Sequence, residues 1–498
     1  MRKGFLIMLA VVLVAALAAP AMAGTDITGF YRAKAWMSNY RTNVIPPTIA
    51  KDAPTNAFVE QRIRLKFSFG EEKVKVVFFT ENDISSWGDA AGSVKTATTD
   101  TTGLGAERNT GGALGGDRIN TEIKNSYVWF QLPNTPLDFT VGLQNQSDAY
   151  AGLIFGAADM AGVFVNGKME PVSFTLGWAK LYEFNSAKSD DLTLYLAAAK
   201  FAPTKDVKLG FNFYFLQDDT GKAIPAIAYP IATGTGALFG TGTGAIPAGV
   251  NSKKIYTPGV DFAVNAGPAT ISGFAIYQFG KIDYSSSAIK DIDISGFAGD
   301  VRLDMNAGPG KLFVEGLYIS GGDNNANKIK SITTFSDFDA SPGGNSAFGR
   351  TDMSILIVNS DDINCAQAMI GARGTAPGGS TSPALTGRGV THLAAGYSMK
   401  FGDKLTGKGG LGYLYANNLL KGSTLTTSSF GFENASKGKT LGYEINANVN
   451  YNIMKGLDFG LYAAYGFLGD YYEYKTETAT LKNPDDPWST TMRLNYAF

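Results

Sequence analysis

The chain ends with residues 488–498, WSTTMRLNYAF, in which apolar and polar side chains alternate. This alternation places Trp488, Thr490, Met492, Leu494, Tyr496 and Phe498 on one face, and Ser489, Thr491, Arg493, Asn495 and Ala497 on the other. Successive side chains of a β-strand point to opposite faces, so the segment predicts a strand with one apolar and one polar face. Such a strand suits the wall of a barrel that has lipid outside and water inside.

The same period of two recurs along the chain. In residues 441–453 the polar positions carry Glu444 and then the ladder Asn446, Asn448, Asn450 and Asn452. Residues 57–69 alternate between apolar side chains and the series Glu60, Arg62, Arg64, Lys66 and Ser68. So many amides and charges would be costly in a dry core, whereas water satisfies them on the wall of a wet interior. Around Ser272 the side chains of Phe274 and Ile276 blur the pattern, which we treat as the noise expected of a single barrel strand.

The connections between these segments alternate between short and long. Tight links occur at residues 70–71, 133–136, 169–171, 203–205, 267–268, 308–310, 402–403 and 454–456. Long polar or glycine-rich stretches occupy residues 39–56, 84–118, 218–253, 321–388, 418–438 and 469–487. Short periplasmic turns and long extracellular loops are typical of a transmembrane antiparallel up-and-down β-barrel, here of about 18 strands with about 16 as the main alternative. An all-β barrel of this size encloses a water-filled channel.

The first 23 residues are expected to be a Sec signal peptide. Arg2 and Lys3 precede an apolar run at residues 5–19, and Ala21-Met22-Ala23 offers small residues for cleavage. The run is shorter than the ~20 apolar residues that a spanning helix needs. We therefore expect residues 24–498 to form a single barrel domain in the outer membrane of a Gram-negative bacterium.

Composition agrees with this prediction. Charged residues make up 17% of the chain, below the ~25% typical of soluble domains. The formal net charge of −1 gives no support for nucleic-acid binding, which requires a basic surface. The single cysteine, Cys365, excludes an internal disulfide.

If the apolar face meets lipid, the opposite face lines the pore. The pore-lining residues expected on this basis are Arg32, Lys34, Glu60, Arg62, Arg64, Lys66, Lys73, Lys75, Arg302, Glu444 and Arg493, with Lys73 and Lys75 on the third strand. Because closure makes the last strand a neighbour of the first, one wall would carry a basic ladder, an arrangement that favours anions. The alternative is that carboxylates such as Glu60, Glu81 and Asp83 neutralise these cations in a lumen that is merely wet.

Residues 148–156, DAYAGLIFG, are unusually apolar for an exposed loop. They follow the fifth expected strand, where large channel-forming barrels often fold a loop inward, so Asp148, Tyr150, Leu153 and Phe155 are candidates for a constriction by fold analogy. The alternative is that the segment packs on the rim or extends a strand.

The sequence gives no support for catalysis, a cofactor or a metal site. Asp323, Asn325 and Asn327 have the spacing of a calcium loop, but Ala326 stands where a ligand or glycine would be needed. The glycine-rich residues 233–244 lack the strand–turn–helix context of a phosphate loop. His392 is the only histidine and is expected to face the lumen without a role. We therefore expect neither an enzyme nor a cofactor protein.

Three stretches resemble the outer-membrane porin superfamily. The ending with Leu494, Tyr496 and Phe498 is similar to the C-terminal signal that barrels present to the insertion machinery, and residues 26–32 resemble a first porin strand. Residues 58–65, with 81–83 and 87–88, are similar to putative porins of anaerobic metal- and sulfate-reducing bacteria and, more distantly, to 18-stranded alginate-export barrels.

The resemblance implies passive diffusion of small hydrophilic solutes or ions. Its implied partners are outer-membrane lipid and the barrel-insertion machinery, and it leaves open a monomer or a homotrimer. Two other functions also remain open at this point: a barrel scaffold around an outer-membrane multihaem cytochrome, and polysaccharide export.

Overall fold

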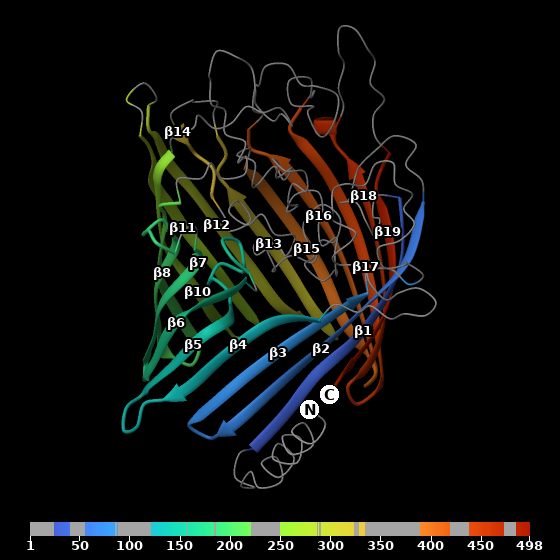
Figure 1. Ribbon diagram of the computed structural model, residues 1–498. Coiled ribbons are helices and arrows are strands. Elements are labelled where there is room, and N and C mark those ends of the chain that lie inside the picture. The colour runs from blue at the N-terminus through green and yellow to red at the C-terminus, as the bar shows by residue number, and fades with distance from the viewer. Residues whose placement is uncertain are drawn as a thin grey trace, which may run out of the picture.

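The computed structural model in Figure 1 describes residues 24–39, 55–84, 87, 121–156, 158–183, 186–220, 250–285, 287, 290–322, 328–333, 389–418, 438–472 and 485–498. The expected signal peptide at residues 1–23, the calcium-like spacing at 323–327, the glycine-rich residues 233–244 and Cys365 lie outside the described residues. Among the residues described, no helix combines the length and apolar character that crossing a bilayer demands.

Eighteen long strands form one closed antiparallel barrel, as expected from the sequence. They are β1 (Gly24–Ser38), β2 (Asn56–Glu71), β3 (Val74–Ile84), β4 (Thr121–Gln131), β5 (Leu137–Gln146), β6 (Ala158–Met169), β7 (Val172–Tyr182), β8 (Leu192–Thr204), β9 (Val207–Asp218), β10 (Val250–Ala266), β11 (Ala269–Tyr284), β12 (Ile292–Ala307), β13 (Gly310–Ile319), β15 (Val390–Phe401), β16 (Leu405–Ala416), β17 (Thr440–Met454), β18 (Leu457–Leu468) and β19 (Trp488–Ala497). A two-residue strand, β14 (Lys328–Ile329), pairs parallel with Asp293 and Ile294 of β12, beyond the end of β13, and η2 (Asp470–Tyr472) is a single 3₁₀ turn.

Each long strand pairs with the next along the chain, and the ring closes between β1 and β19. The register of the closing pair places Lys34 opposite Arg493 and Phe30 opposite Ala497. Beyond β19, the backbone N–H of Phe498 donates to the Gly29 carbonyl at 3.0 Å, and the Gly29 N–H donates to the Phe498 carbonyl at 2.9 Å. Among the described residues, every long strand thus has a neighbouring strand on each side, whereas the interior of a bilayer would not tolerate an open sheet.

The two faces of the wall differ as the alternation predicts. On the outer face, Ile445 and Met492 are 56% and 52% exposed, whereas Glu444 on the inner face of β17 is buried. The three residues of the terminal signal, Leu494, Tyr496 and Phe498, are all exposed apolar side chains. An outer surface covered by exposed apolar side chains requires hydrocarbon around it.

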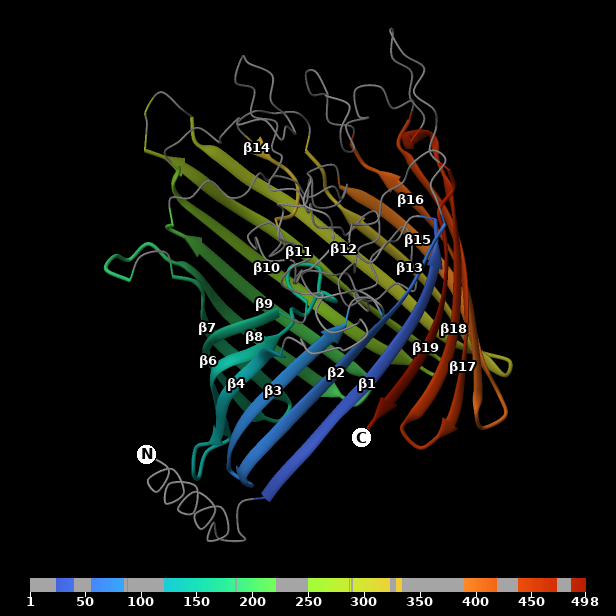
Figure 2. The same cartoon turned by 45° about the vertical axis from the view of Figure 1, so that its right-hand side comes forward.

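Short turns join the strands at one end of the barrel, seen at the bottom of Figures 1 and 2. Gly267 and Gly308 adopt φ values of +63° and +58° in two of these turns, a backbone region that favours glycine. Two expectations at strand ends are wrong. Lys73 lies in the turn before β3, which begins at Val74, and β10 begins at Val250, three residues before the expected end of its loop. Turn chemistry alone does not specify how far the pairing of two strands extends.

Candidate functional site

A basic stripe runs along the inner face of β19, β1, β2 and β3. The alternation of these strands places seven cations and four carboxylates on that face: Arg32, Lys34, Arg62, Arg64, Lys66, Lys75 and Arg493, against Asp26, Glu60, Glu81 and Asp83. Cross-strand pairing sets Arg32 directly opposite Arg62, and Lys34 between Glu60 and Arg493. Like charges directly opposite each other are destabilising, so this wall needs compensation from elsewhere.

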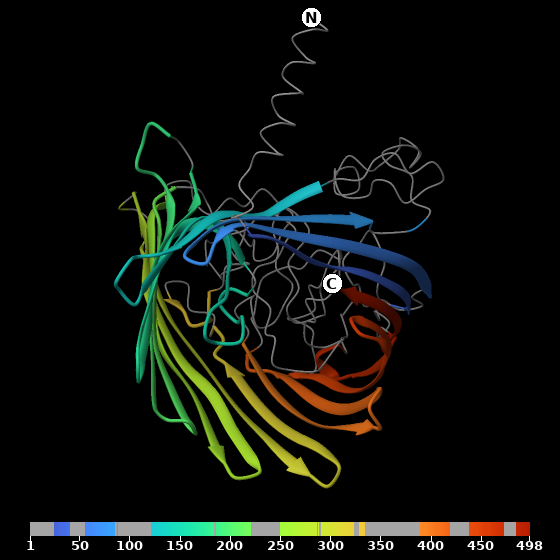
Figure 3. The same cartoon turned by 90° about the horizontal axis from the view of Figure 1, so that it is seen from below.

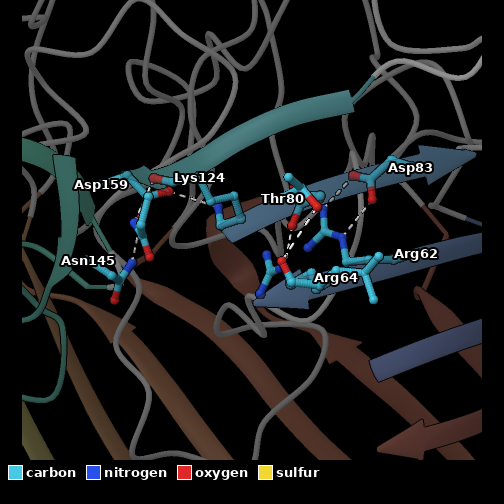
Figure 4. A network of polar contacts seen from close by, with 10 residues as sticks. Arg62, Arg64, Thr80, Asp83, Lys124, Asn145 and Asp159 are labelled. Carbon is cyan, nitrogen blue, oxygen red and sulfur yellow. Dashed lines mark hydrogen bonds and ion pairs between the residues drawn. The ribbon is translucent and has the colours of Figure 1, made fainter. Parts of the chain in front are cut away.

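Carboxylates of β3 supply part of that compensation (Figure 4). Arg62 binds Asp83 in a bidentate pair, with Nε to Oδ1 at 2.8 Å and Nη2 to Oδ2 at 2.6 Å, and its Nη2 also lies 3.1 Å from Glu81 Oε1. Arg64 Nε donates to Glu81 Oε2. The pairs follow from register, because Arg62 faces Asp83 and Arg64 faces Glu81 across the β2–β3 ladder. Two of the expected ladder residues are therefore fixed in position and partly neutralised.

Aromatic rings lie beside four cations of the stripe, one of which is Arg64. The guanidinium groups of Arg32 and Arg64 lie 5.7 and 5.6 Å from the centre of the Phe30 ring, and Lys34 Nζ lies 5.4 Å from that of Trp36. Arg493 lies 4.9 Å from the centre of the Tyr462 ring. The rings of Phe30, Trp36 and Tyr462 carry no net charge, so these contacts position the cations without neutralising them.

Beside the stripe lies a polar group that the sequence did not reveal (Figure 4). Asp159 of β6 accepts hydrogen bonds from Asn125 and Asn145, both at 2.9 Å, and its Oδ2 lies 2.8 Å from Lys124 Nζ. The β3–β4 pairing shifts register next to Lys124. Such a bulge redirects side chains locally, and no residue type in this stretch signals it.

The remaining expected pore residues are Arg302 on β12 and Glu444 on β17. Arg302 of β12 lies 2.9 Å from both Asp304 and Glu315, so it too belongs to a compensated cluster. Glu444 accepts a hydrogen bond from Asn446 Nδ2 at 2.9 Å, the first step of the asparagine ladder on β17. His392 is fully buried, with Nδ1 3.9 Å from Glu315 Oε1.

Residues 148–156 fold onto the inner wall, as the teal loop inside the ring of strands in Figure 3 shows. The ring of Tyr150 packs against Tyr214 of β9 and Phe274 of β11, with centroids 5.6 and 5.4 Å away. Phe155 packs against Tyr214 at 5.2 Å, and Leu153 is also buried. Burial of these side chains against barrel strands explains the apolar composition of the segment. The apolar inner residues Phe274 and Ile276 are the surface onto which it docks, so treating them as noise was wrong.

One carboxylate organises this segment. Asp148 Oδ1 accepts the backbone N–H groups of Tyr150 and Gly152, and Oδ2 accepts those of Ile154 and Phe155, at 2.6–2.9 Å. Burial raises the pKa of Asp148 to about 6, while the four backbone donors lower it. The carboxyl is therefore ionised at neutral pH, when an anionic acceptor serves all four N–H groups.

A second segment, residues 328–333, also lies against the inner wall. Thr333 exchanges hydrogen bonds with the side chain of Gln278 on β11, at 2.6 and 2.9 Å, and Ser320 Oγ donates to the Lys330 carbonyl at 2.6 Å. Ile329 and Ile332 are buried. This segment belongs to the long connection expected at residues 321–388, and the sequence did not indicate its contact with the wall, because two buried isoleucines are too few to give a period.

Solved structures with the same architecture are outer-membrane porins. OccAB4 of Acinetobacter baumannii matches with a TM-score of 0.51 and 8% identity, over 96% of this chain and 99% of that one. The fold is that of an outer-membrane porin. A BenF-like porin from Pseudomonas fluorescens Pf-5 (TM-score 0.49, 10% identity, 95% and 98% covered) and OccK11 (OpdR) of Pseudomonas aeruginosa (0.48, 9%, 95% and 96%) are also similar. No protein-family model and no curated protein sequence matches the chain. A closed barrel of this type, apolar on its outer face, resides in the outer membrane.

Proposed function

We propose that the protein is a passive channel for small hydrophilic solutes or ions, with a weak preference for anions. The observation that carries the proposal is the excess of cations on the inner face of β19, β1, β2 and β3. A wall with more positive than negative groups raises the local concentration of anions. The preference is weak because Glu81 and Asp83 neutralise part of the stripe through Arg62 and Arg64.

The proposal includes a constriction formed by residues 148–156. This segment leaves the wall between β5 and β6 and occupies space inside the ring (Figure 3). Asp148 holds its backbone, while Tyr150, Leu153 and Phe155 fasten it to the inner wall. A fixed inward loop narrows the path for solutes and sets an upper limit on their size.

The same inward segments weigh against the other two functions. A cytochrome sheath or a polysaccharide exporter would need the interior that residues 148–156 and 328–333 occupy. Residues 58–65 resemble porins of anaerobic bacteria and alginate-export barrels. In this proposal that resemblance supports a channel function only. Transport through such a pore requires no catalytic group, and insertion would use Leu494, Tyr496 and Phe498 as the terminal signal.

Single-channel recording of the refolded protein in a planar bilayer tests the proposal. Steady ohmic steps are expected, with a reversal potential in a salt gradient that lies on the anion-selective side. A barrel that inserts, resists heat in detergent and conducts nothing would contradict a channel function. Steps with a cation-selective reversal potential would contradict only the anion preference.

Replacing both Arg62 and Arg64 with serine should shift the reversal potential by several millivolts toward cation selectivity. The substitutions remove two positive charges and leave Glu81 and Asp83 on the same wall without their arginine partners. The matched control is the double variant Glu81→Gln with Asp83→Asn, which removes two negative charges from the same cluster and should shift the potential the opposite way. If both variants shift it equally in one direction, the charges do not act on permeating ions.

A further inference from the structure

The outer wall over β7 to β11 is hollowed by an apolar groove of about 760 Å³. One row of its lining follows the cross-strand register: Phe174 faces Ala199, which faces Phe211, then Val260 and Ala275. A second row begins Leu176, Ala197, Phe213 and Pro258 in the same way. The hollow exists because alanines and a proline stand between larger side chains on neighbouring strands.

The floor of the groove is a thin part of the wall. Pro258 has no backbone N–H, and the β10–β11 pairing passes from Tyr256–Phe279 directly to Gly259–Ile276. On the lumen side, Gln278 Nε2 donates to Thr257 Oγ1 at 3.2 Å. This side-chain hydrogen bond links β10 and β11 where their backbone pairing is interrupted. Gly259 shares the lumen-facing parity of Thr257, and because it has no side chain the wall there is backbone alone, with the Tyr150 ring lying against its inner side.

The groove has the course and length of one lipid chain. Its first row starts two residues from the turn end of β7, which begins at Val172, and reaches the middle of β11 at Ala275. Five strands spaced roughly 4.8 Å apart give it a length of about 19 Å. One leaflet of the hydrocarbon core is about 15 Å thick, so a chain that enters beside β7 and follows the oblique groove would be covered along most of its length.

We propose that this groove binds one acyl chain of a phospholipid from the periplasmic leaflet. The groove is continuous with the lipid-facing surface, since Leu176, Phe211 and Val260 around it are exposed apolar residues. Lys205, in the turn between β8 and β9, stands at the periplasmic rim where the lipid phosphate would lie. A positive side chain at that level complements a phosphate headgroup. The site is independent of what passes through the lumen.

Spin-labelled phosphatidylglycerol in phosphatidylethanolamine vesicles provides the test. Wild-type protein should hold one slowly exchanging, immobilised lipid per barrel, seen by electron paramagnetic resonance and by native mass spectrometry after detergent extraction. Ala197→Trp and Ala199→Trp fill the groove and should lower this occupancy at least fivefold. The control Ala463→Trp adds the same bulk to the outer face of β18 and should retain the lipid. Heat-modifiable migration on gels confirms that each variant is folded.

Two results would overturn the proposal. The first is equal lipid occupancy in the wild type and in both groove variants, which would make the bound lipid ordinary annular lipid. The second is the formation of disulfide-linked dimers in the membrane by the variant Ala199→Cys in a Cys365→Ser background. Such dimers would mean that another barrel, rather than a lipid chain, covers the groove. The lipid site predicts that this variant stays monomeric under oxidation.

Discussion

The variant Asp148→Ala is expected to conduct at least twice as much current per channel as the wild type. Its carboxylate accepts the backbone N–H groups of Tyr150, Gly152, Ile154 and Phe155. Leaving a buried donor unsatisfied costs about 1–3 kcal/mol, so losing four acceptor contacts offsets most of the burial energy of the segment's apolar side chains, roughly 1.5–3 kcal/mol each. The segment should therefore leave the inner wall for much of the time. Single-channel recording measures the current, and limited proteolysis between residues 148 and 156 measures the release.

The isosteric variant Asp148→Asn is the matched control. Its side-chain oxygen still accepts two of the four N–H groups, while its NH₂ group faces the other two. Conductance and cleavage should therefore lie between those of the wild type and Asp148→Ala. Unchanged conductance in the alanine variant, together with wild-type resistance to protease, would mean that side-chain packing alone holds the segment. Larger conductance without cleavage would place the change elsewhere in the pore.

The barrel could be predicted from the sequence because strand periodicity is a local property. Residues 488–498 and 441–453 alternate within single strands, and lipid on one side enforces the pattern. The inward segment 148–156 was also visible, since four apolar side chains in an expected loop need a surface to cover them. What the sequence could not supply was that surface: Phe274 and Ile276 lie on another strand, and their contact with Tyr150 depends on the closed ring.

The sequence named Glu81 and Asp83 as carboxylates that could neutralise the ladder, but it could not assign each one to a particular arginine, for a related reason. Arg62 binds Asp83 because the β2–β3 register sets them opposite each other, and a shift of two residues would pair Arg62 with Glu81 instead. Register depends on the length of pairing across the whole hairpin, which explains why Lys73 was assigned to β3 although it lies in the turn. The bulge beside Lys124 is a further shift of this kind, and the outer groove arises only where the registers of five strands align small residues.

The variant Gly259→Ala is expected to displace residues 148–156 through the wall on which they dock. A Cβ at Gly259 would stand 2.7 Å from Ile276 Cγ2 and 2.8 Å from Tyr150 Cζ, and closer still to the Tyr150 hydroxyl. Overpacking of this kind costs roughly 1–3 kcal/mol. Gly259 is paired with Ile276 of β11 on one side and with Asn212 in the continuous β9–β10 ladder on the other, so the loop is the part that yields. We expect noisier and larger current steps in single-channel recordings and no change in heat-modifiable migration.

Gly299→Ala is the control, since a Cβ there meets only the Phe274 carbonyl oxygen at 3.5 Å, an ordinary contact. It should leave the current unchanged. The decisive comparison adds Tyr150→Leu, which removes the ring that a Cβ at Gly259 would strike. If Tyr150 transmits the effect, Gly259→Ala should have little further effect in that background, because the two substitutions act on one contact and cannot be additive. Fully additive changes in current would mean that Ile276 and the strand backbone, rather than the inward loop, absorb the strain, and that the coupling between wall and loop is absent.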